Sequence, residues 1–292
     1  MKIKGILPAL VTPLNGDETI NVPVLNKLIS DLIEQGADGF YIGGATGEGL
    51  ALRTGERKVL AEAAIAAANK KIPCIIQVAA TVFSDAIDLA KHAEKAGAAA
   101  ISATAPLFFA YDEDDVYSYY KTLAASVHIP LMVYYSPAAN FRISADFARR
   151  LFEIDNVTAI KWTSTDFYQM LRLKDITNGE INILNGFDEM LLSGLSAGAD
   201  GGIGSTYNYQ LRHIRGVYDS FTKNETQKAA EYQKKVNRVV SSFGGEPVIP
   251  FSKAVLECMG YAVGNAAFPM KRYSEDEKMR IFERVSPWLP KI

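Results

Sequence analysis

The sequence is poor in the residues that bind metals or carry thiol chemistry. Its 292 residues include two cysteines, Cys74 and Cys258, which form none of the short spacings of zinc or redox sites. Both stand among apolar residues, so we expect buried free thiols and a reducing compartment. His92 and His213 fall in predicted helices, and His128 precedes a predicted strand. We therefore expect no metal site and no metal cofactor.

The sequence also lacks an excess of one charge and a long hydrophobic run. A net charge of −2 gives no electrostatic basis for binding nucleic acid or membranes. The longest apolar stretch, 96–111, contains Pro106 and is too short to span a bilayer. Pro8 and Pro13 interrupt the N-terminal apolar run, which favours a first strand over a signal peptide. These features predict a cytoplasmic protein that acts on small molecules.

Short apolar runs alternate with amphipathic stretches along most of the chain. Strands are predicted near 5–12, 38–44, 73–80, 99–105, 130–135, 157–162, 181–186 and 200–204. Their nearly continuous hydrophobicity is typical of parallel strands that are buried on both faces. The clearest intervening helices are 22–35, 55–70, 84–96 and 112–126. Eight βα units predict an α/β fold, a (β/α)8 barrel. An open doubly wound sheet is the alternative, but the first turn lacks its glycine pattern.

The last part of the chain has no comparable apolar run. Residues 225–243, 249–260 and 274–289 read as three more helices. Because no linker-like segment precedes them, we expect residues 225–292 to form a helical extension packed on a barrel of residues 1–224.

Lys161 stands in a strand where charge is unexpected. Apolar residues surround it in "VTAIKW" (157–162). Burial penalises the ammonium form and favours a free amine, which can form an imine with a ketone. Strand alternation places Lys161 and Thr163 on one face and Trp162 on the other. The alternatives are a lysine that reaches the rim or pairs with a carboxylate.

Three further segments end predicted strands, where a barrel of this type carries its active site. Tyr134 ends the strand before Lys161 and could relay protons or simply cap the core. The glycine-rich turn 41–50 is neither a P-loop nor a dinucleotide fingerprint. Its exposed N–H groups and the Thr46 hydroxyl could hold a carboxylate, or its glycines could only make a tight turn. Asp188 and Glu189, in "NGFDEM", could bind hydroxyls or cap the next helix.

Together these motifs resemble the pyruvate-dependent class I aldolase superfamily, which includes N-acetylneuraminate lyases and dihydrodipicolinate synthases. The Gly-Gly-x-Thr-Gly-Glu turn of residues 43–48, Tyr134 and Lys161 appear in the order of that superfamily. The stretches 160–170, 185–189 and 194–208 resemble the lyase branch.

The resemblance implies an enzyme without cofactor that reversibly cleaves N-acetylneuraminate to N-acetylmannosamine and pyruvate, and a homotetramer. It implies that Lys161 forms the imine, that Tyr134 is the acid/base group, and that Ala45 and Thr46 hold the carboxylate. The residues implied at the sugar end are Thr163, Gly186, Asp188, Glu189 and Ser205. A lyase for another 2-keto-3-deoxy sugar acid, a dihydrodipicolinate synthase and a non-catalytic sugar-acid sensor are the alternatives.

Three positions bear on these alternatives. The synthase branch carries an arginine where this chain has Ala139, so no guanidinium is available there for a second carboxylate. Ala45 stands where many lyases have Ser or Thr, which removes one side-chain hydrogen bond but leaves the backbone N–H groups. Phe108 stands where many relatives have Tyr; we expect its ring to keep an aromatic wall without a proton route.

Overall fold

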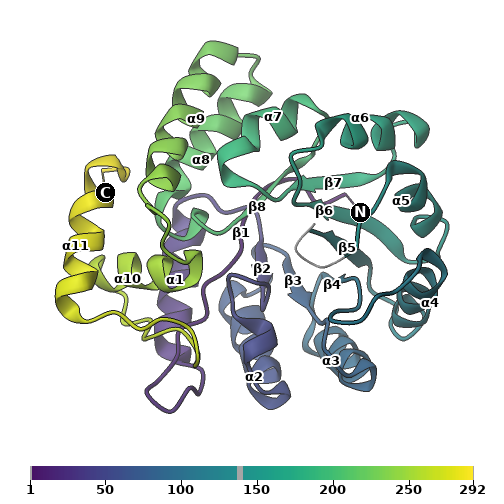
Figure 1. The fold of residues 1–292 in the computed structure, drawn as a ribbon, viewed down its shortest axis with the longest axis horizontal. Helices are drawn as coiled ribbons and strands as arrows, with labels where there is room; N and C mark the ends of the chain where they lie inside the picture. The colour runs from purple at the N-terminus through teal and green to yellow at the C-terminus, as the bar shows by residue number, and fades with distance from the viewer. Residues whose placement is uncertain (1, 137–140, 292) are drawn as a thin grey trace.

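The barrel predicted from the sequence is present. The computed structural model describes residues 2–136 and 141–291, and within them eight parallel strands form one sheet. The strands are β1 (Gly5–Pro8), β2 (Phe40–Ile42), β3 (Cys74–Gln77), β4 (Ala100–Thr104), β5 (Leu131–Tyr135), β6 (Val157–Trp162), β7 (Asn182–Asn185) and β8 (Gly201–Gly204). β1 pairs with β8, and the Leu10 N–H donates to the Tyr41 carbonyl at 2.9 Å, which links β1 to β2. The sheet thus closes on itself, and an open doubly wound sheet is excluded (Figure 1).

Helices surround the barrel, one after each strand (Figure 1). They are α1 (Val22–Glu34), α2 (Thr54–Ala68), α3 (Phe83–Ala96), α4 (Glu113–Ala124), α5 (Ala145–Leu151), α6 (Phe167–Ile176), α7 (Leu191–Ser196) and α8 (Tyr207–Thr222). Short 3-10 turns occupy Gly49–Ala51, Asp188–Met190 and Ser286–Trp288. Local sequence explains several starts: Asp112 and Asp115 form a capping box at α4, and the Ser144 hydroxyl accepts from the Phe147 N–H at α5.

Strand alternation divides the apolar side chains into an inner and an outer core. The inner core takes residues from every strand or the residue that follows it: Leu7, Ala9, Tyr41, Ile75, Ala100, Met132, Tyr134, Ala159, Leu184 and Ile203. The outer core lies between the strands and the helices and includes Ile160 and Trp162. Because successive side chains point to opposite faces, Lys161 follows Ala159 inward while Trp162 packs outward.

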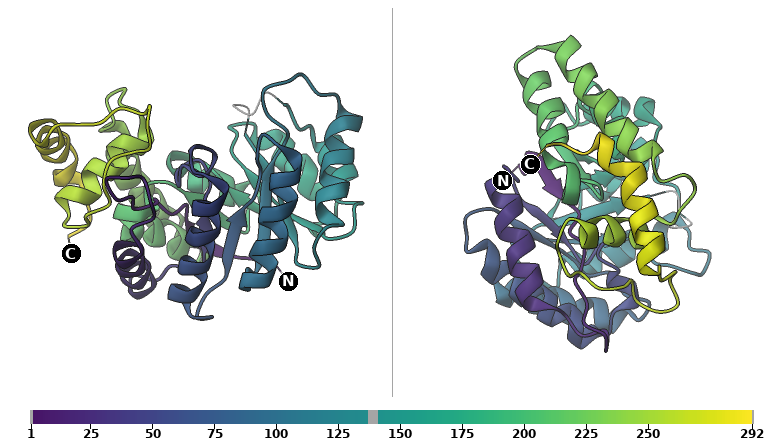
Figure 2. Two further views of the ribbon diagram at one scale, coloured as in Figure 1. Left: turned by 90° about the horizontal axis from the view of Figure 1, so that it is seen from below. Right: turned by 90° about the vertical axis from the view of Figure 1, so that its left-hand side faces the viewer.

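Three more helices follow the barrel, as predicted: α9 (Thr226–Ser241), α10 (Val248–Cys258) and α11 (Glu275–Val285). α9 packs against α8, and α10 contacts both α8 and α11. Figures 1 and 2 show α10 and α11 on one flank of the barrel. Val236 and Phe251 belong to the same outer core as the barrel residues. The helices therefore pack on the barrel; a domain boundary after residue 224 stays a prediction.

The cysteines and histidines lie away from the carboxyl ends of the strands. Cys74 is buried as expected, and burial raises the pKa of its thiol to about 12. The expectation that Cys258 is buried is wrong: it is partly exposed, because it ends α10 on the outer flank. His92 and His213 lie on α3 and α8, and His128 precedes β5 at the opposite end of the barrel.

None of the helices in the described part of the chain has both the length and the hydrophobicity needed to cross a membrane.

Candidate active site

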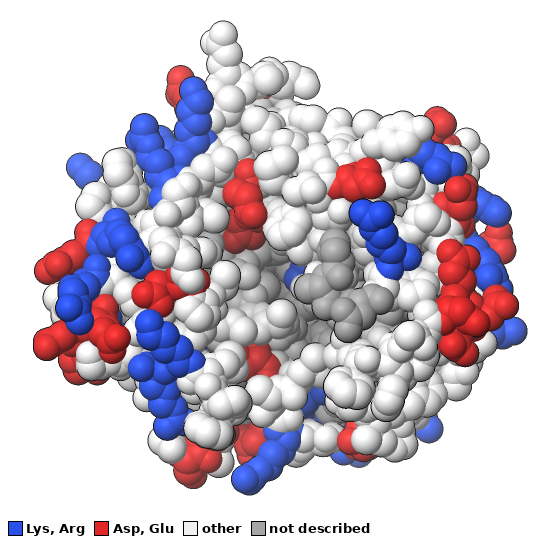
Figure 3. Space-filling model, viewed as in Figure 1, with Lys and Arg blue, Asp and Glu red and all other residues white. Residues whose placement is uncertain are grey.

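A cavity of about 280 Å³ opens at the carboxyl ends of the strands. All nine residues predicted for the site line it: Ala45, Thr46, Tyr134, Lys161, Thr163, Gly186, Asp188, Glu189 and Ser205. Phe187, Ile203, Thr206, Val240, Phe243 and Val248 complete the lining. Figure 3 shows a hollow near the centre of this face, with acidic side chains at its edge and a small basic area inside. The fold thus brings together segments that are up to about 200 residues apart in the chain.

Lys161 lies in the wall of this cavity and is 5% exposed. Its Nζ lies 4.5 Å from the ring centroid of Tyr41 and 4.2 Å from that of Tyr134. It forms no ion pair with any carboxylate that the structure describes. Neither a lysine at the solvent rim nor one held by a carboxylate fits this geometry. The side chain is an amine in an aromatic pocket, open to the cavity.

Tyr134 is placed opposite Lys161 by the register of the sheet. The two residues are direct partners in the pairing of β5 with β6. Tyr134 packs in the inner core and also lines the cavity, so it does cap the core, and its role as a proton relay stays a prediction. Its ring meets that of Tyr41 nearly at right angles, with 6.0 Å between centroids. The Tyr134 ring therefore packs against the Lys161 amine.

The turn of residues 43–49 places Ala45 and Thr46 in the lining of the cavity. The Glu48 N–H donates to the Ala45 carbonyl at 3.0 Å, and the Thr12 hydroxyl donates to the Gly47 carbonyl at 2.7 Å. No acceptor lies within hydrogen-bond distance of the N–H groups of Ala45 and Thr46 among the described residues. The hydroxyls of Thr46 and Ser205 are 2.7 Å apart. Adjacent free donors of this kind suit an anion such as a carboxylate.

Asp188 and Glu189 have different surroundings. Asp188 is buried, and its Oδ2 accepts from the Thr206 N–H at 2.7 Å and the Thr206 hydroxyl at 2.5 Å. Asp188 thus accepts hydrogen bonds from the residue that precedes α8. It does not cap α7, the next α-helix in the chain. Glu189 is partly exposed and lines the cavity, and its carboxylate has no such partner among the residues that the structure describes. Glu189 is therefore the carboxylate that remains available to hydroxyl groups of a ligand.

Burial raises the pKa of Asp188 to about 6, against an ordinary value of 3.8. The folded state then holds this proton more tightly than the unfolded chain. The associated stability is complete below about pH 3.8 and is lost as the pH rises through about 6. We expect the free energy of unfolding of the wild type, relative to Asp188→Asn, to fall by on the order of 2–3 kcal/mol between pH 4 and pH 7. Urea titrations across this range measure the difference.

Asp200→Asn is a matched control for that measurement. Burial opposes ionisation of Asp200, but hydrogen bonds from Lys174, the Ile183 N–H and Asn182 outweigh burial and lower its pKa. The stability that ionised Asp200 contributes is present above about pH 3.8 and is lost as the pH falls below it. The free energy of unfolding of the wild type relative to Asp200→Asn should therefore not fall between pH 4 and pH 7. Parallel pH profiles for the wild type and Asp188→Asn would contradict the account of Asp188.

Several lining residues escaped the sequence analysis. Tyr41, which contacts Lys161 from behind the lining, was also missed but was recognisable, because alternation in β2 turns it inward beside Lys161. Thr206 had the weaker signal of following Ser205 at the end of β8. Phe243 and Val248 come from the helical extension, and no local pattern marks them as cavity residues.

One expected wall residue is elsewhere. Phe108 is 80% exposed and does not line the cavity, so the expectation that its ring keeps an aromatic wall there is wrong for the single chain. Its backbone is left-handed, with φ of 79°, and its ring packs on Phe109 instead. Ala139, which distinguishes the chain from the synthase branch, lies outside the described residues.

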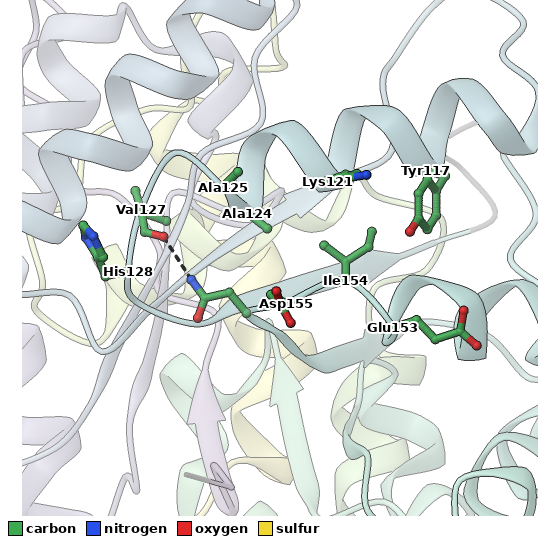
Figure 4. A pocket seen from close by; sticks show the side chains of 10 residues that line it. Tyr117, Lys121, Ala124, Ala125, Val127, His128, Glu153, Ile154 and Asp155 are labelled. Atoms are coloured by element: carbon green, nitrogen blue, oxygen red, sulfur yellow. Dashed lines mark hydrogen bonds between the residues drawn. The ribbon is translucent and has the colours of Figure 1, made fainter.

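A larger groove, of about 670 Å³, lies at the opposite end of the barrel. It runs between α4 and the loop before β6, with His128 toward one end and Tyr117 and Glu153 toward the other (Figure 4). The Asn156 side-chain amide donates to the Val127 carbonyl at 3.1 Å. This hydrogen bond joins the loop before β6 to the loop that follows α4. Barrel enzymes carry their chemistry at the carboxyl ends of the strands, so size does not make this groove the active site.

No group of three or more His, Cys, Asp or Glu side chains is arranged to hold a metal ion in the ranges that the structure covers. The polar groups of the cavity are an amine, a phenol, hydroxyls, amide N–H groups and carboxylates.

The fold places this protein in the class of (β/α)8 barrels, and its cavity contains a buried lysine on strand β6. The chain belongs to the dihydrodipicolinate synthetase family, whose pattern matches residues 2–286. It is 33% identical to an N-acetylneuraminate lyase of Rhizobium meliloti over 289 residues, covering 99% of this chain and 96% of the relative.

Solved structures superpose on this chain over nearly its whole length. A protein of Clostridium difficile named CdNal, in complex with mannosamine, superposes with a TM-score of 0.94 at 31% identity and covers 99% of this chain and 100% of its own. N-acetylneuraminate lyase of Proteus mirabilis matches with a TM-score of 0.94 at 28% identity, covering 99% of both chains. A dihydrodipicolinate synthase of Bacillus anthracis matches with a TM-score of 0.93 at 26% identity, covering 100% of both chains. The fold is therefore shared by lyases and synthases.

Proposed function

We propose that this protein is an N-acetylneuraminate lyase, a class I aldolase that reversibly cleaves N-acetylneuraminate to N-acetylmannosamine and pyruvate. The observation that carries the proposal is Lys161, a buried amine that lines a cavity beside the phenol of Tyr134. Curated relatives that bear this name align over nearly the whole chain, which supports the choice of substrate.

The cavity provides groups for each part of such a substrate. The free N–H groups of Ala45 and Thr46 suit its carboxylate. Thr163, Gly186, Glu189 and Ser205 line the part of the cavity proposed for the polyhydroxyl chain. Asp188 supports this end by holding the start of α8. Val240, Phe243 and Val248 add apolar surface, which suits the methyl group of an N-acetyl substituent.

The proposed mechanism needs no cofactor. The Lys161 amine attacks the C2 ketone of the open-chain sugar acid, and water leaves to give an iminium ion. The iminium accepts the electron pair of the C3–C4 bond as that bond breaks, while the C4 hydroxyl gives up its proton through Tyr134. N-acetylmannosamine leaves as the aldehyde. The remaining enamine takes a proton at C3, and hydrolysis of the imine releases pyruvate and the free amine.

Two features favour a lyase over a synthase. The position at which the synthase branch carries an arginine is Ala139 in this sequence, so that cation is missing. Glu189 adds a negative charge to the cavity, which would repel a second carboxylate and can accept hydrogen bonds from hydroxyl groups. Both differences suit an uncharged polyol as the second part of the substrate.

Turnover assays test the substrate. We expect release of pyruvate from N-acetylneuraminate to exceed that from 2-keto-3-deoxygluconate by at least about tenfold in kcat/KM, because only the former fills the apolar wall. The reverse order would assign the protein to another 2-keto-3-deoxy sugar acid. Imine formation without release of product would assign it to a sensor.

We further propose a homotetramer in the cytoplasm, with no nucleic-acid or membrane partner. Phe108 and Phe109 are 80% and 64% exposed, and they follow Leu107, which lines a pocket of about 330 Å³ of mixed apolar and polar lining together with Phe83 and Asp115. Exposed aromatic rings beside such a pocket are suited to contact with a second copy. Sedimentation equilibrium that gives the mass of a monomer at micromolar concentration would contradict self-association.

A further inference from the structure

A buried ion pair joins the turn of residues 43–49 to helix α10. Lys253 Nζ lies 2.6 Å from Glu48 Oε1, and the two side chains are 2% and 0% exposed. Neither residue lines the cavity. Burying two charges carries a large desolvation cost, and such pairs are often no more stable than apolar residues of equal volume. Stability alone is therefore a poor explanation for this pair.

Each partner of the pair makes one more hydrogen bond to the helical extension or to the loop that follows α10. Glu48 Oε2 accepts from the Ala267 N–H at 2.6 Å, and Lys253 Nζ donates to the Asn265 carbonyl at 2.8 Å. The carboxylate of Glu48 is thus held at both oxygens. The extension fixes the position of a residue that belongs to the barrel's second βα loop.

Glu48 in turn determines the shape of the carboxylate-binding turn. Its backbone is left-handed, with φ of 59°, a conformation that a residue other than glycine keeps when its surroundings hold it. Its N–H closes the turn on the Ala45 carbonyl at 3.0 Å. The direction of the free N–H groups of Ala45 and Thr46 therefore depends on where Glu48 is held.

The other end of the pair is tied to the cavity wall. Lys253 and the cavity residue Val248 lie on the same helix, α10. The pair consequently sets the distance between the turn proposed for the carboxylate and the apolar wall of the extension. The hydrogen bonds of Glu48 Oε2 to the Ala267 N–H and of Lys253 Nζ to the Asn265 carbonyl have defined directions. Together with the ion pair they specify this arrangement more sharply than apolar contacts, which have no preferred direction.

We propose that Glu48 and Lys253 are positioning residues for recognition of the substrate carboxylate: the pair orients the N–H groups of Ala45 and Thr46 and couples them to the helical extension. This inference rests on the proposed function, since it assumes that a 2-keto acid binds beside Lys161. Glu48 and Lys253 themselves do not touch the substrate.

The test compares two ketones that differ in the carboxylate. Borohydride trapping on Lys161 is measured by mass spectrometry as a function of the concentration of pyruvate, and separately of acetone. Glu48→Gln keeps one acceptor oxygen for the Ala267 N–H but replaces the charged oxygen that faces Lys253 by an NH2 donor. Lys253→Met keeps an unbranched side chain of nearly the same length but removes the ammonium group. Lys174→Met is the control, because it breaks the partly buried Lys174–Asp200 pair, 2.9 Å long, at the opposite end of the barrel.

We expect the half-saturating pyruvate concentration to rise about tenfold or more in Glu48→Gln and Lys253→Met, because a misdirected anion site loses binding. Trapping of acetone, which has no carboxylate, should stay within about twofold of the wild type. Lys174→Met should leave both curves unchanged. Glu48→Gln carries the test if Lys253→Met fails to fold, as judged by circular dichroism.

The possible failures are distinguishable. A wild type that traps no pyruvate refutes the proposed function itself. A wild type that traps pyruvate, with unchanged half-saturation in Glu48→Gln, overturns the inference and leaves the function standing. An equal loss of pyruvate and acetone trapping in Glu48→Gln also overturns it, since the pair would then support the barrel and not the anion site.

Discussion

Borohydride reduction in the presence of pyruvate is expected to attach a pyruvate-derived group to Lys161. The Lys161 side chain lines the cavity, which gives a small ketone access to Nζ. Reduction converts the reversible imine into a stable secondary amine, so the peptide that contains Lys161 should gain the mass of the reduced adduct.

Lys161→Met removes the amine while keeping a side chain that fills the same space. We expect cleavage of N-acetylneuraminate to fall by at least about 10³-fold, since the iminium is the only electron sink in the proposed mechanism. Lys121→Met, in the groove at the far end of the barrel, is the control and should retain full activity. An adduct on another lysine, or an active Lys161→Met enzyme, would refute the mechanism.

Tyr134→Phe is expected to lower kcat by about 10²–10⁴-fold, the usual contribution of a positioned acid or base. The phenylalanine ring keeps the packing against Tyr41 and Lys161, so the barrel core should stay intact. What is lost is the hydroxyl that carries the proton from C4.

Tyr135→Phe is the matched control for that substitution. Tyr135 is the next residue on β5 and faces outward, where its ring packs 4.8 Å from that of Trp162. Loss of its hydroxyl should leave kcat within about twofold of the wild type, because its ring lies in the outer core. Equal losses in the two variants would show that general packing, not proton transfer, accounts for the effect of Tyr134.

The local patterns of the chain were sufficient for the barrel and for the candidates Lys161, Tyr134, Asp188, Glu189 and the turn around Thr46, whereas the resemblance to the aldolase superfamily supplied Ala45, Gly186 and the remaining residues of the site. The apolar runs lie within a few residues of the eight strands, and the three C-terminal helices start within a residue of their predicted positions. Alternation in 157–162 correctly turned Lys161 inward and Trp162 outward. These predictions succeed because a buried strand is recognisable from the hydrophobicity of its own residues. The chemical roles of the nine residues stay predictions until they are tested.

The predictions that failed concern relations between distant segments. Phe108 was expected to keep an aromatic wall of the site, yet it is exposed, because the path of the loop after β4 turns its ring away. Cys258 was expected to be buried, but it ends a helix on the outer flank. Neither result is encoded in the few residues around the position.

The sequence by itself determined the order of the strands, the inward face of β6 and the identity of Lys161, Tyr134 and the turn around Thr46. These features follow from side-chain periodicity and from turn residues, which act over a few positions. Only the tertiary structure decided that Thr206 holds Asp188, that Phe243 and Val248 wall the cavity, and that Lys253 meets Glu48. The last pair is separated by about 200 residues, and only the closed barrel with its packed extension brings the two charges together.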